Sequence, residues 1–107
     1  MAELEPERAT VQIEMHLDPA GTQVVILAGE LDSSNADSLQ ERVASIPPQP
    51  PRRLIFDLTH LRFMDSAGIA VLIGAAKASS VSLRNPSPII RRVLEATGLS
   101  GVFSIEP

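Results

Sequence analysis

The chain has 107 residues, a formal net charge of −4 and a pI near 5.0, and it contains three Phe but no Cys, Trp or Tyr. The acidic balance and the shortage of aromatic side chains for base stacking argue against a nucleic-acid-binding protein, which needs a basic face. The absence of Cys excludes disulfides, thiolate catalysis and Cys-based zinc sites, and the length suits one domain with a single core.

The N-terminal residues 1–9 ("MAELEPERA") do not resemble a signal peptide. No apolar run approaches the ~18–20 residues that a membrane-spanning helix needs. We therefore expect a flexible N-terminal segment over residues 1–9, one domain over residues 10–107, no membrane association and a cytoplasmic location.

The first two predicted strands form a hairpin. Residues Thr10–Leu17 alternate between apolar and polar side chains, which is the pattern of a half-buried strand. Asp18–Gly21 ("DPAG") favours a turn, and Val24–Ala28 is apolar throughout, as expected for a central strand buried on both faces.

A helix is predicted after Gly29–Asp32 ("GELD"). Ser34 and Asp37 have the spacing of a capping box at its start. Apolar side chains then recur on one helical stripe, at Ala36, Leu39, Val43 and Ile46. Pro47–Pro51 ("PPQPP") ends the helix, because proline cannot continue it, and we interpret this stretch as a stiff surface connector rather than a domain linker.

The rest of the chain alternates strands and helices. The sequence predicts a buried strand over Leu54–Leu58, then a helix after Ser66 that ends near Ala78, and a short strand over Val81–Arg84. A third helix follows, with Ser87 as N-cap, Pro88 as its first residue and Gly98 closing it, and a last strand covers Val102–Ile105. Such alternation predicts right-handed crossovers between parallel strands. The predicted fold class is therefore α/β: a single small domain with a mixed, mostly parallel sheet that starts with a β-hairpin, and helices packed on it.

The helix that follows Phe63–Gly68 ("FMDSAG") is apolar on two faces. The face expected to meet the sheet carries Ile69, Leu72, Ile73 and Ala76. The opposite face is small and nearly uncharged, and it carries Ala67, Val71, Gly74 and Ala78. Either another segment such as residues 1–9 covers this face, or another protein docks on it. We favour docking, because a chain of this length has little material left for a cover.

Ser66 stands at the predicted strand-to-helix junction, where two roles are open to it. Its hydroxyl could cap the helix by accepting one of the first backbone N–H groups, which contributes about 1 kcal/mol. It could also accept a phosphate, because a helix N-terminus stabilises negative charge and the small Ala67 and Gly68 leave a kinase unobstructed access. Asp65 could cap the helix, orient Ser66 or take part in phosphoryl transfer, and the sequence does not separate these roles.

Three stretches of the chain, "GELD", "FMDSAG" and "NPSPIIRRVLEATGL" (Asn85–Leu99), resemble the STAS domain of bacterial anti-sigma factor antagonists, and the resemblance covers Thr10–Ile105. It implies a STAS-like domain over residues 10–107 that binds an anti-sigma factor and thereby frees a sigma factor for transcription. In this family the anti-sigma factor is also a serine kinase. It uses its own bound ATP to phosphorylate the antagonist and abolish binding, and a serine phosphatase restores binding. The resemblance implies no cofactor for the chain itself.

The resemblance also assigns roles to individual residues. By position, Ser66 matches the phosphoacceptor, Asp65 the acid before it, and Asp32 the acid of "GELD", which in the family lies near the phosphorylation site. Together with the small helix face, the predicted partner-binding residues are Asp32, Asp65, Ser66, Ala67, Gly68, Val71, Gly74 and Ala78. The chain departs from the family twice: Ala67 stands where many relatives carry Ser or Thr, and the connection at Ser79–Val81 is shorter than usual.

Other functions are less well supported by the residues. His16 is predicted on the polar side of a strand and His60 in a loop, and the two give neither a catalytic triad nor a metal-ligand spacing. We therefore predict no enzyme activity, no catalytic residue and no metal site. A nucleotide site would need a Gly-rich loop followed by Lys, which the chain lacks. The alternative that stays open is a STAS interaction module of a stress-signalling scaffold or of a lipid transport complex.

Overall fold

The computed structural model describes residues 10–47 and 52–107, so the predicted segment 1–9 and most of the proline-rich connector lie outside the described residues. In chain order the elements are β1 (Val11–Leu17), β2 (Gln23–Leu31), α1 (Ala36–Ala44), β3 (Arg53–Met64), α2 (Ser66–Ala78), β4 (Ser80–Arg84), α3 (Pro88–Ala96), the short 3₁₀ helix η1 (Leu99–Gly101) and β5 (Ser104–Glu106). The predicted alternation of strands and helices after the hairpin is confirmed.

The strands form one sheet. Within the described part of the chain, five strands lie side by side in the order β1-β2-β3-β4-β5. β1 pairs with β2 antiparallel, and the other neighbouring pairs are parallel. Each parallel pair needs a crossover connection, which α1 supplies between β2 and β3 and α2 supplies between β3 and β4. This arrangement confirms the predicted fold class: a single small α/β domain with a mixed, mostly parallel sheet that starts with a β-hairpin.

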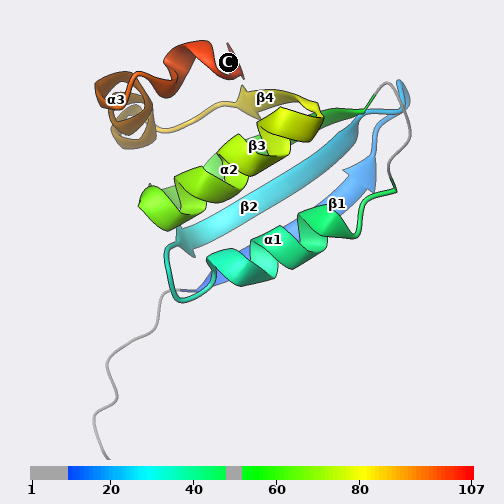
Figure 1. Cartoon of the computed structure of the whole chain (residues 1–107), viewed down its shortest axis with the longest axis horizontal. Helices are drawn as coiled ribbons and strands as arrows, with labels where there is room; N and C mark the ends of the chain where they lie inside the picture. Colours follow the sequence, from blue (N-terminus) through cyan, green and yellow to red (C-terminus); the bar gives the residue numbers. More distant parts are fainter. Residues whose placement is uncertain (1–9, 48–51) are drawn as a thin grey trace, which may run out of the picture.

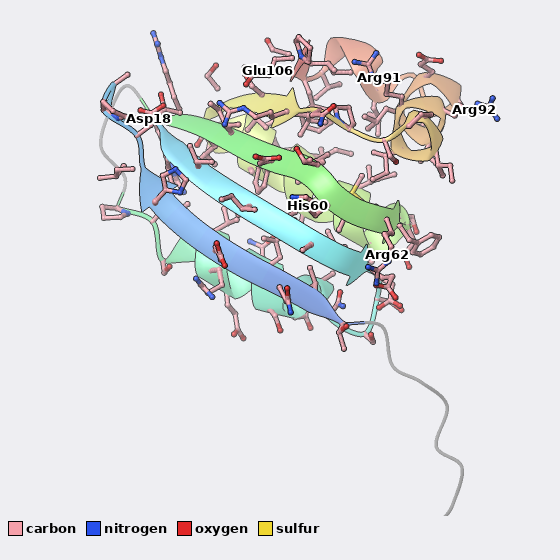
Figure 2. The ribbon with its side chains drawn as sticks, turned by 180° about the vertical axis from the view of Figure 1, so that it is seen from behind. Asp18, His60, Arg62, Arg91, Arg92 and Glu106 are labelled. Atoms are coloured by element: carbon pink, nitrogen blue, oxygen red, sulfur yellow. The ribbon has the colours of Figure 1, made fainter. Side chains whose placement is uncertain are left out.

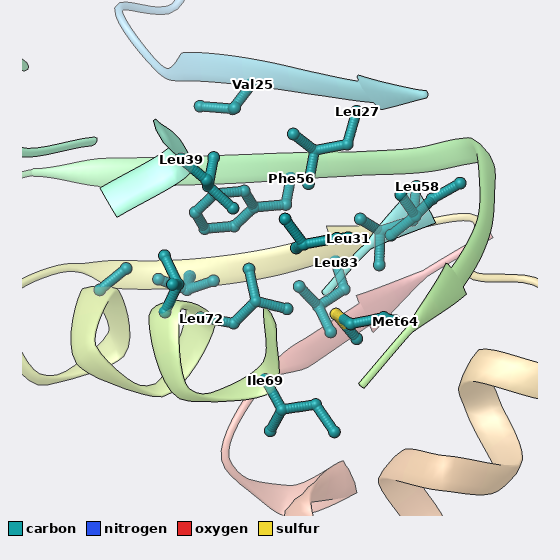
Figure 3. Packing of buried hydrophobic residues seen from close by; sticks show 14 of the residues in the cluster. Val25, Leu27, Leu31, Leu39, Phe56, Leu58, Met64, Ile69, Leu72 and Leu83 are labelled. Atoms are coloured by element: carbon teal, nitrogen blue, oxygen red, sulfur yellow. The ribbon is translucent and has the colours of Figure 1, made fainter. Parts of the chain in front are cut away.

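Most of the core lies between this sheet and two helices, and α3 adds the buried side chains of Ile90 and Leu94 to it. α1 and α2 run side by side across one face of the sheet, and α3 lies beyond them near β4, at the end of the sheet that β5 closes (Figure 1). Leu27 of β2 and Phe56 of β3 are fully buried beneath the helices, where Leu39 of α1 and Leu72 of α2 meet them (Figure 3). The stripe predicted for the first helix is confirmed, because all four of its members are buried: Ala36, Leu39, Val43 and Ile46.

The opposite face of the sheet is seen from behind in Figure 2, where no described helix covers it. The strand register places one row of mostly charged side chains across it: Glu14, Ile26, Asp57, Arg84 and Glu106. Arg84 Nε donates to Glu106 Oε1 at 2.7 Å, which raises the pKa of Arg84. The expectation that β2 is buried on both faces is thus only half right, since Ile26 and Ala28 are half-buried on this side.

The largest difference from the predicted elements is the length of β3. This strand continues to Met64 rather than ending at Leu58, and His60, predicted in a loop, lies within it and pairs with Ala28 of β2 (Figure 2). Two shifts in the register between β2 and β3 interrupt the strict alternation of side chains, as β-bulges do. The second half of the strand also has no apolar run comparable to Leu54–Phe56 in the first half, so the sequence did not mark it as a strand. β5 also starts later than predicted, at Ser104.

The start of α1 differs from the predicted capping box. The helix begins at Ala36 with Asn35 as the N-cap residue. Ser34 does not cap it, because its hydroxyl donates to Asp32 Oδ1 at 2.6 Å. Asn35 instead fixes the turn before the helix: its Oδ1 accepts from the Asp32 N–H and its Nδ2 donates to the Glu30 carbonyl.

The predicted ends of α3 are confirmed. The Ser87 hydroxyl accepts from the Ile90 N–H at 3.3 Å, and Pro88 is the first helical residue, where its missing N–H leaves no bond unmade. Gly98 follows the helix with a φ of 73°, a left-handed conformation that glycine adopts without strain.

Candidate functional site

The start of α2 is capped by Asp65 rather than by Ser66. Asp65 Oδ1 accepts from the Ala67 N–H at 2.9 Å and from the Gly68 N–H at 3.3 Å. The Asp65 backbone is extended, and its carbonyl accepts the first helical bond from the Ile69 N–H at 3.0 Å. The carboxylate therefore satisfies two of the helix's orphan donors and places a negative charge at the favourable end of the helix dipole. Of the roles left open for Asp65, capping is the one that the geometry supports.

Ser66 is the first residue of α2, and its side chain is exposed. Because Asp65 takes the capping role, the Ser66 hydroxyl makes no hydrogen bond to any other residue that the structure describes. The capping role considered for Ser66 is therefore wrong. The hydroxyl is free for other chemistry at a helix N-terminus, where added negative charge is stabilised.

The turn before α1 lies against the start of α2. Asp65 Oδ2 accepts from the Ser33 N–H at 3.3 Å, and the Asp65 N–H donates to the Leu31 carbonyl at 3.1 Å. Asp32 holds this turn together, since its Oδ1 accepts from both the N–H and the hydroxyl of Ser34, at 2.8 and 2.6 Å. The "GELD" and "FMDSAG" motifs thus meet where the carboxyl ends of β2 and β3 lie next to each other, as the Leu31–Met64 pairing requires.

The exposed face of α2 differs by one position from the predicted one. Val71, predicted to face outward, is only 7% exposed and belongs to the core cluster. α1 lies along this flank of α2 and widens the buried arc of the helix beyond the part that faces the sheet (Figure 1). Four residues spaced four apart remain exposed, and we call them the α2 strip: Ser66, Ala70, Gly74 and Ala78.

Two other predicted partner-binding residues are less exposed than the α2 strip. Ala67 is half-buried, and Gly68 is buried. A Cβ on Gly68 would lie 2.7 Å from Met64 Cγ and 2.8 Å from Leu31 Cδ2, so this glycine lets the helix approach the strands. Ala70, which the helical wheel did not select, occupies the outward-facing position that the wheel had given to Val71.

Two exposed side chains stand near the end of β3, shortly before Asp65 in the chain. Phe63 is 47% exposed, an unusual position for one of the chain's three Phe. Arg62, next to it in the strand, forms an ion pair with Glu30 at 2.5 Å and is well exposed. The sequence offered little indication for Phe63, because an aromatic residue in a strand usually points into the core.

The positions of the two histidines bear on a catalytic role for Ser66. Among the described residues, the side chains of His16 and His60 form no hydrogen bond with Ser66, and the second lies on the sheet face away from α2 (Figure 2). In residues 10–47 and 52–107 no three His, Asp or Glu side chains gather as metal ligands would. No helix in this part of the chain is long and apolar enough to cross a membrane.

Comparisons with known proteins agree on one family. The family model of the STAS domain matches residues 13–107 of this chain. The anti-sigma F factor antagonist of Paenibacillus polymyxa is 30% identical over 103 residues, which cover 91% of this chain and 85% of that protein. A crystal structure of an anti-sigma factor antagonist from Mycobacterium paratuberculosis has a TM-score of 0.76 at 25% identity, over 92% of this chain and 86% of that one.

The fold also resembles SpoIIAA, a Bacillus cell fate determinant solved in two forms. The unphosphorylated form has a TM-score of 0.70 at 26% identity, covering 88% of this chain and 87% of that chain. The phosphorylated form has a TM-score of 0.65 at the same identity, covering 88% and 90%.

Proposed function

The chain belongs to the STAS domain family, and from this premise we propose that it is an anti-sigma factor antagonist. In this proposal its unphosphorylated form binds an anti-sigma factor that is also a serine kinase, and binding releases a sigma factor in the cytoplasm. The kinase supplies the ATP, so the chain itself needs no cofactor and carries out no catalysis. The relatives' names as anti-sigma factor antagonists support the general role.

We propose Ser66 as the phosphorylated residue. The observation that carries this assignment is an exposed hydroxyl with no hydrogen bond to the described residues, at the first position of α2. A kinase can reach this oxygen without unfolding the domain or breaking a cap. The related SpoIIAA has been solved in a phosphorylated form, which supports phosphorylation as a modification within this fold.

Phosphorylation would act on the interface rather than on the fold. A phosphate adds about −1.5 to −2 charges at neutral pH. At the start of α2 the domain tolerates this charge, because the helix dipole is positive there. The same dianion stands at one end of the α2 strip, where Ala70 and Gly74 let a partner approach closely. A partner packed on that strip would have to desolvate the phosphate, and an acidic partner would also be repelled.

A kinase assay tests the proposal. The purified chain is incubated with candidate anti-sigma serine kinases and ATP, and the product is analysed by intact mass and phosphosite mapping. We expect one added phosphate confined to Ser66 and no addition to Ser66→Ala. Ser33→Ala is the control and should be modified normally, because Ser33 is also an exposed serine and its N–H donates to Asp65 Oδ2. Phosphate on Ser33 instead of Ser66 would refute the assignment.

Binding measurements with the same kinase test the switch. Ser66→Ala is expected to bind like the wild type, since the hydroxyl has no role in the fold. Ser66→Asp is expected to bind at least about tenfold more weakly, which corresponds to about 1.4 kcal/mol. Equal affinity of Ser66→Asp and wild type, measured by calorimetry, would contradict the electrostatic account.

A further inference from the structure

One edge of the sheet is open. β1 is an outermost strand (blue in Figure 2), and no strand in the described part of the chain pairs with its outer side, which we call the β1 edge. β1 is seven residues long, pairs with β2 without a register shift, and contains neither Pro nor Lys. Short strands, bulges, Pro and Lys are the usual features that keep an edge strand from pairing with another chain. β5, at the other edge, spans only three residues, so β1 is the edge that can accept a further strand.

The free backbone groups of the β1 edge belong to alternate residues. The Glu30 N–H donates to the Thr10 carbonyl at 2.9 Å, just before β1 begins. In an antiparallel pair, residues that exchange hydrogen bonds alternate with residues that do not. The even-numbered residues of β1 therefore bond toward β2. The N–H and C=O groups of the odd-numbered residues point to the open side, and these residues are Val11, Ile13, Met15 and Leu17.

The side chains of β1 differ between its two faces. On the helix side, Ile13 and Met15 pack against the core but are only half-buried, and Leu17 is 67% exposed. A large apolar side chain this exposed at the end of a strand is unusual. On the other side, Glu14 and His16 are both exposed. A strand added to the β1 edge would thus need apolar side chains on one face and polar partners for a carboxylate and an imidazole on the other.

A second copy of β1 meets these needs in one register. Two antiparallel copies must bond through their odd-numbered residues, so the possible registers differ in steps. With Met15 opposite Met15 of the second copy, Leu17 lies opposite Ile13, and Glu14 lies opposite His16, whose N–H can donate to the carboxylate. One step away, Glu14 would face Glu14 of the second copy. One step in the other direction, Glu14 would face Asp18, and like charges directly opposite each other are destabilising.

We propose that the chain forms a two-fold symmetric dimer through the β1 edge, with Met15 of both copies at the axis. The two sheets join into one, and each Leu17 is covered by Ile13 of the second copy. α2 lies on the far side of α1 from this edge (Figure 1), so the α2 strip and Ser66 of each copy stay accessible. The dimer does not depend on the proposed function, but it would present two copies of the candidate site to one partner.

Sedimentation velocity over a wide range of concentrations tests for the dimer. We expect the wild type to shift from monomer to dimer as its concentration rises. Leu17→Ser should weaken dimerisation at least about tenfold, because the change acts twice in a symmetric dimer. Ile89→Ser is the matched control, since Ile89 is 63% exposed on α3 and should leave dimerisation unchanged. A monomer at every concentration, or equal dimerisation of these two variants, would refute the proposal.

Charge exchange on the exposed face tests the pairing of Glu14 with His16. His16→Glu should weaken the dimer, because it places two carboxylates opposite each other. The double variant Glu14→Lys/His16→Glu should restore it, because opposite charges then face each other again. Both side chains are exposed, so the fold should not change. A double variant that dimerises no better than His16→Glu would contradict this pairing.

Disulfide cross-linking tests the register. The chain has no Cys, so a single introduced thiol can react only with the same residue of a second copy. Directly opposite residues in a hydrogen-bonded antiparallel pair have Cα atoms about 5.5 Å apart, which a disulfide can bridge. Mild oxidation should therefore cross-link Met15→Cys with itself. Ile13→Cys, at an equally half-buried position, should cross-link only when mixed with Leu17→Cys. Self-cross-linking of Ile13→Cys as fast as that of Met15→Cys would overturn the register.

Discussion

Adding one methyl group at Gly68 should destabilise the domain. The new Cβ would lie 2.7 Å from Met64 Cγ and 2.8 and 2.9 Å from Leu31 Cδ2 and Cγ, well inside contact distance. These two side chains are 4% and 0% exposed, so they have no free space into which to move. Overpacking of this kind costs about 1–3 kcal/mol, and the better helix propensity of alanine returns at most about 1 kcal/mol. We expect Gly68→Ala to lose about 1–2 kcal/mol of unfolding free energy.

Gly74→Ala in the same helix is the matched control. A Cβ there would meet nothing within 4 Å, and Gly74 is exposed in the helix interior. This variant should gain about 0.5–1 kcal/mol, because glycine destabilises a helix interior by that amount relative to alanine. Urea unfolding measures both: the two unfolding free energies should differ by about 1.5–3 kcal/mol, and with a slope of roughly 1–3 kcal/mol per molar urea the two midpoints should separate by about 0.5–3 M. A Gly68→Ala variant as stable as Gly74→Ala would refute the close-packing account.

Three further outcomes follow from the same geometry. Gly29→Ala should lose several kcal/mol of unfolding free energy in urea, more than Gly68→Ala. The φ of Gly29 is 99°, and a Cβ there would collide with the Thr10 carbonyl oxygen, a backbone atom that cannot rotate away. A smaller loss than that of Gly68→Ala would contradict this account. Asp65→Ala should lose about 1 kcal/mol of unfolding free energy because the helix cap is missing. Asp65→Asn and Ser66→Ala should stay near the wild-type stability in thermal unfolding. A larger loss in Ser66→Ala than in Asp65→Ala would reverse our assignment of the cap. Phosphorylated Ser66 should leave the unfolding free energy within about 1 kcal/mol of the unmodified chain, and a much larger drop would mean that the switch acts through the fold.

The elements that sequence reasoning predicted correctly are those in which local chemistry and burial agree. The stripe of α1, the Ser87 cap and the Gly98 terminus each depend on residues within a few positions of one another. The second half of β3 is different, because its polar side chains lie on the face of the sheet that no described helix covers. Its strand character comes from pairing with β2, a contact between distant parts of the chain that the local pattern does not contain.

Sequence reasoning placed the candidate site at the start of α2, but it did not assign the role of each side chain there. Ser, Asp and Asn are all good capping residues, so composition alone could not choose between Asp65 and Ser66, or between Ser34 and Asn35. Val71 was misplaced because the helical wheel considered only the sheet, whereas α2 also packs against α1 (Figure 1). A helical wheel is expected to misplace a residue by one position when the helix packs against two elements at once.

The different roles of Asp65 and Ser66 make this junction suitable for the switch that we propose. If Ser66 capped α2, phosphorylation would replace a structural hydrogen bond, and the modified chain would lose part of its fold together with its partner. Because Asp65 caps α2 and accepts a hydrogen bond from the turn at Ser33, the Ser66 hydroxyl makes no hydrogen bond that holds the described structure together. Modification then changes the charge at one end of the α2 strip while the strip itself stays in place. A reversible switch needs this separation, since a phosphatase must find the modified domain still folded.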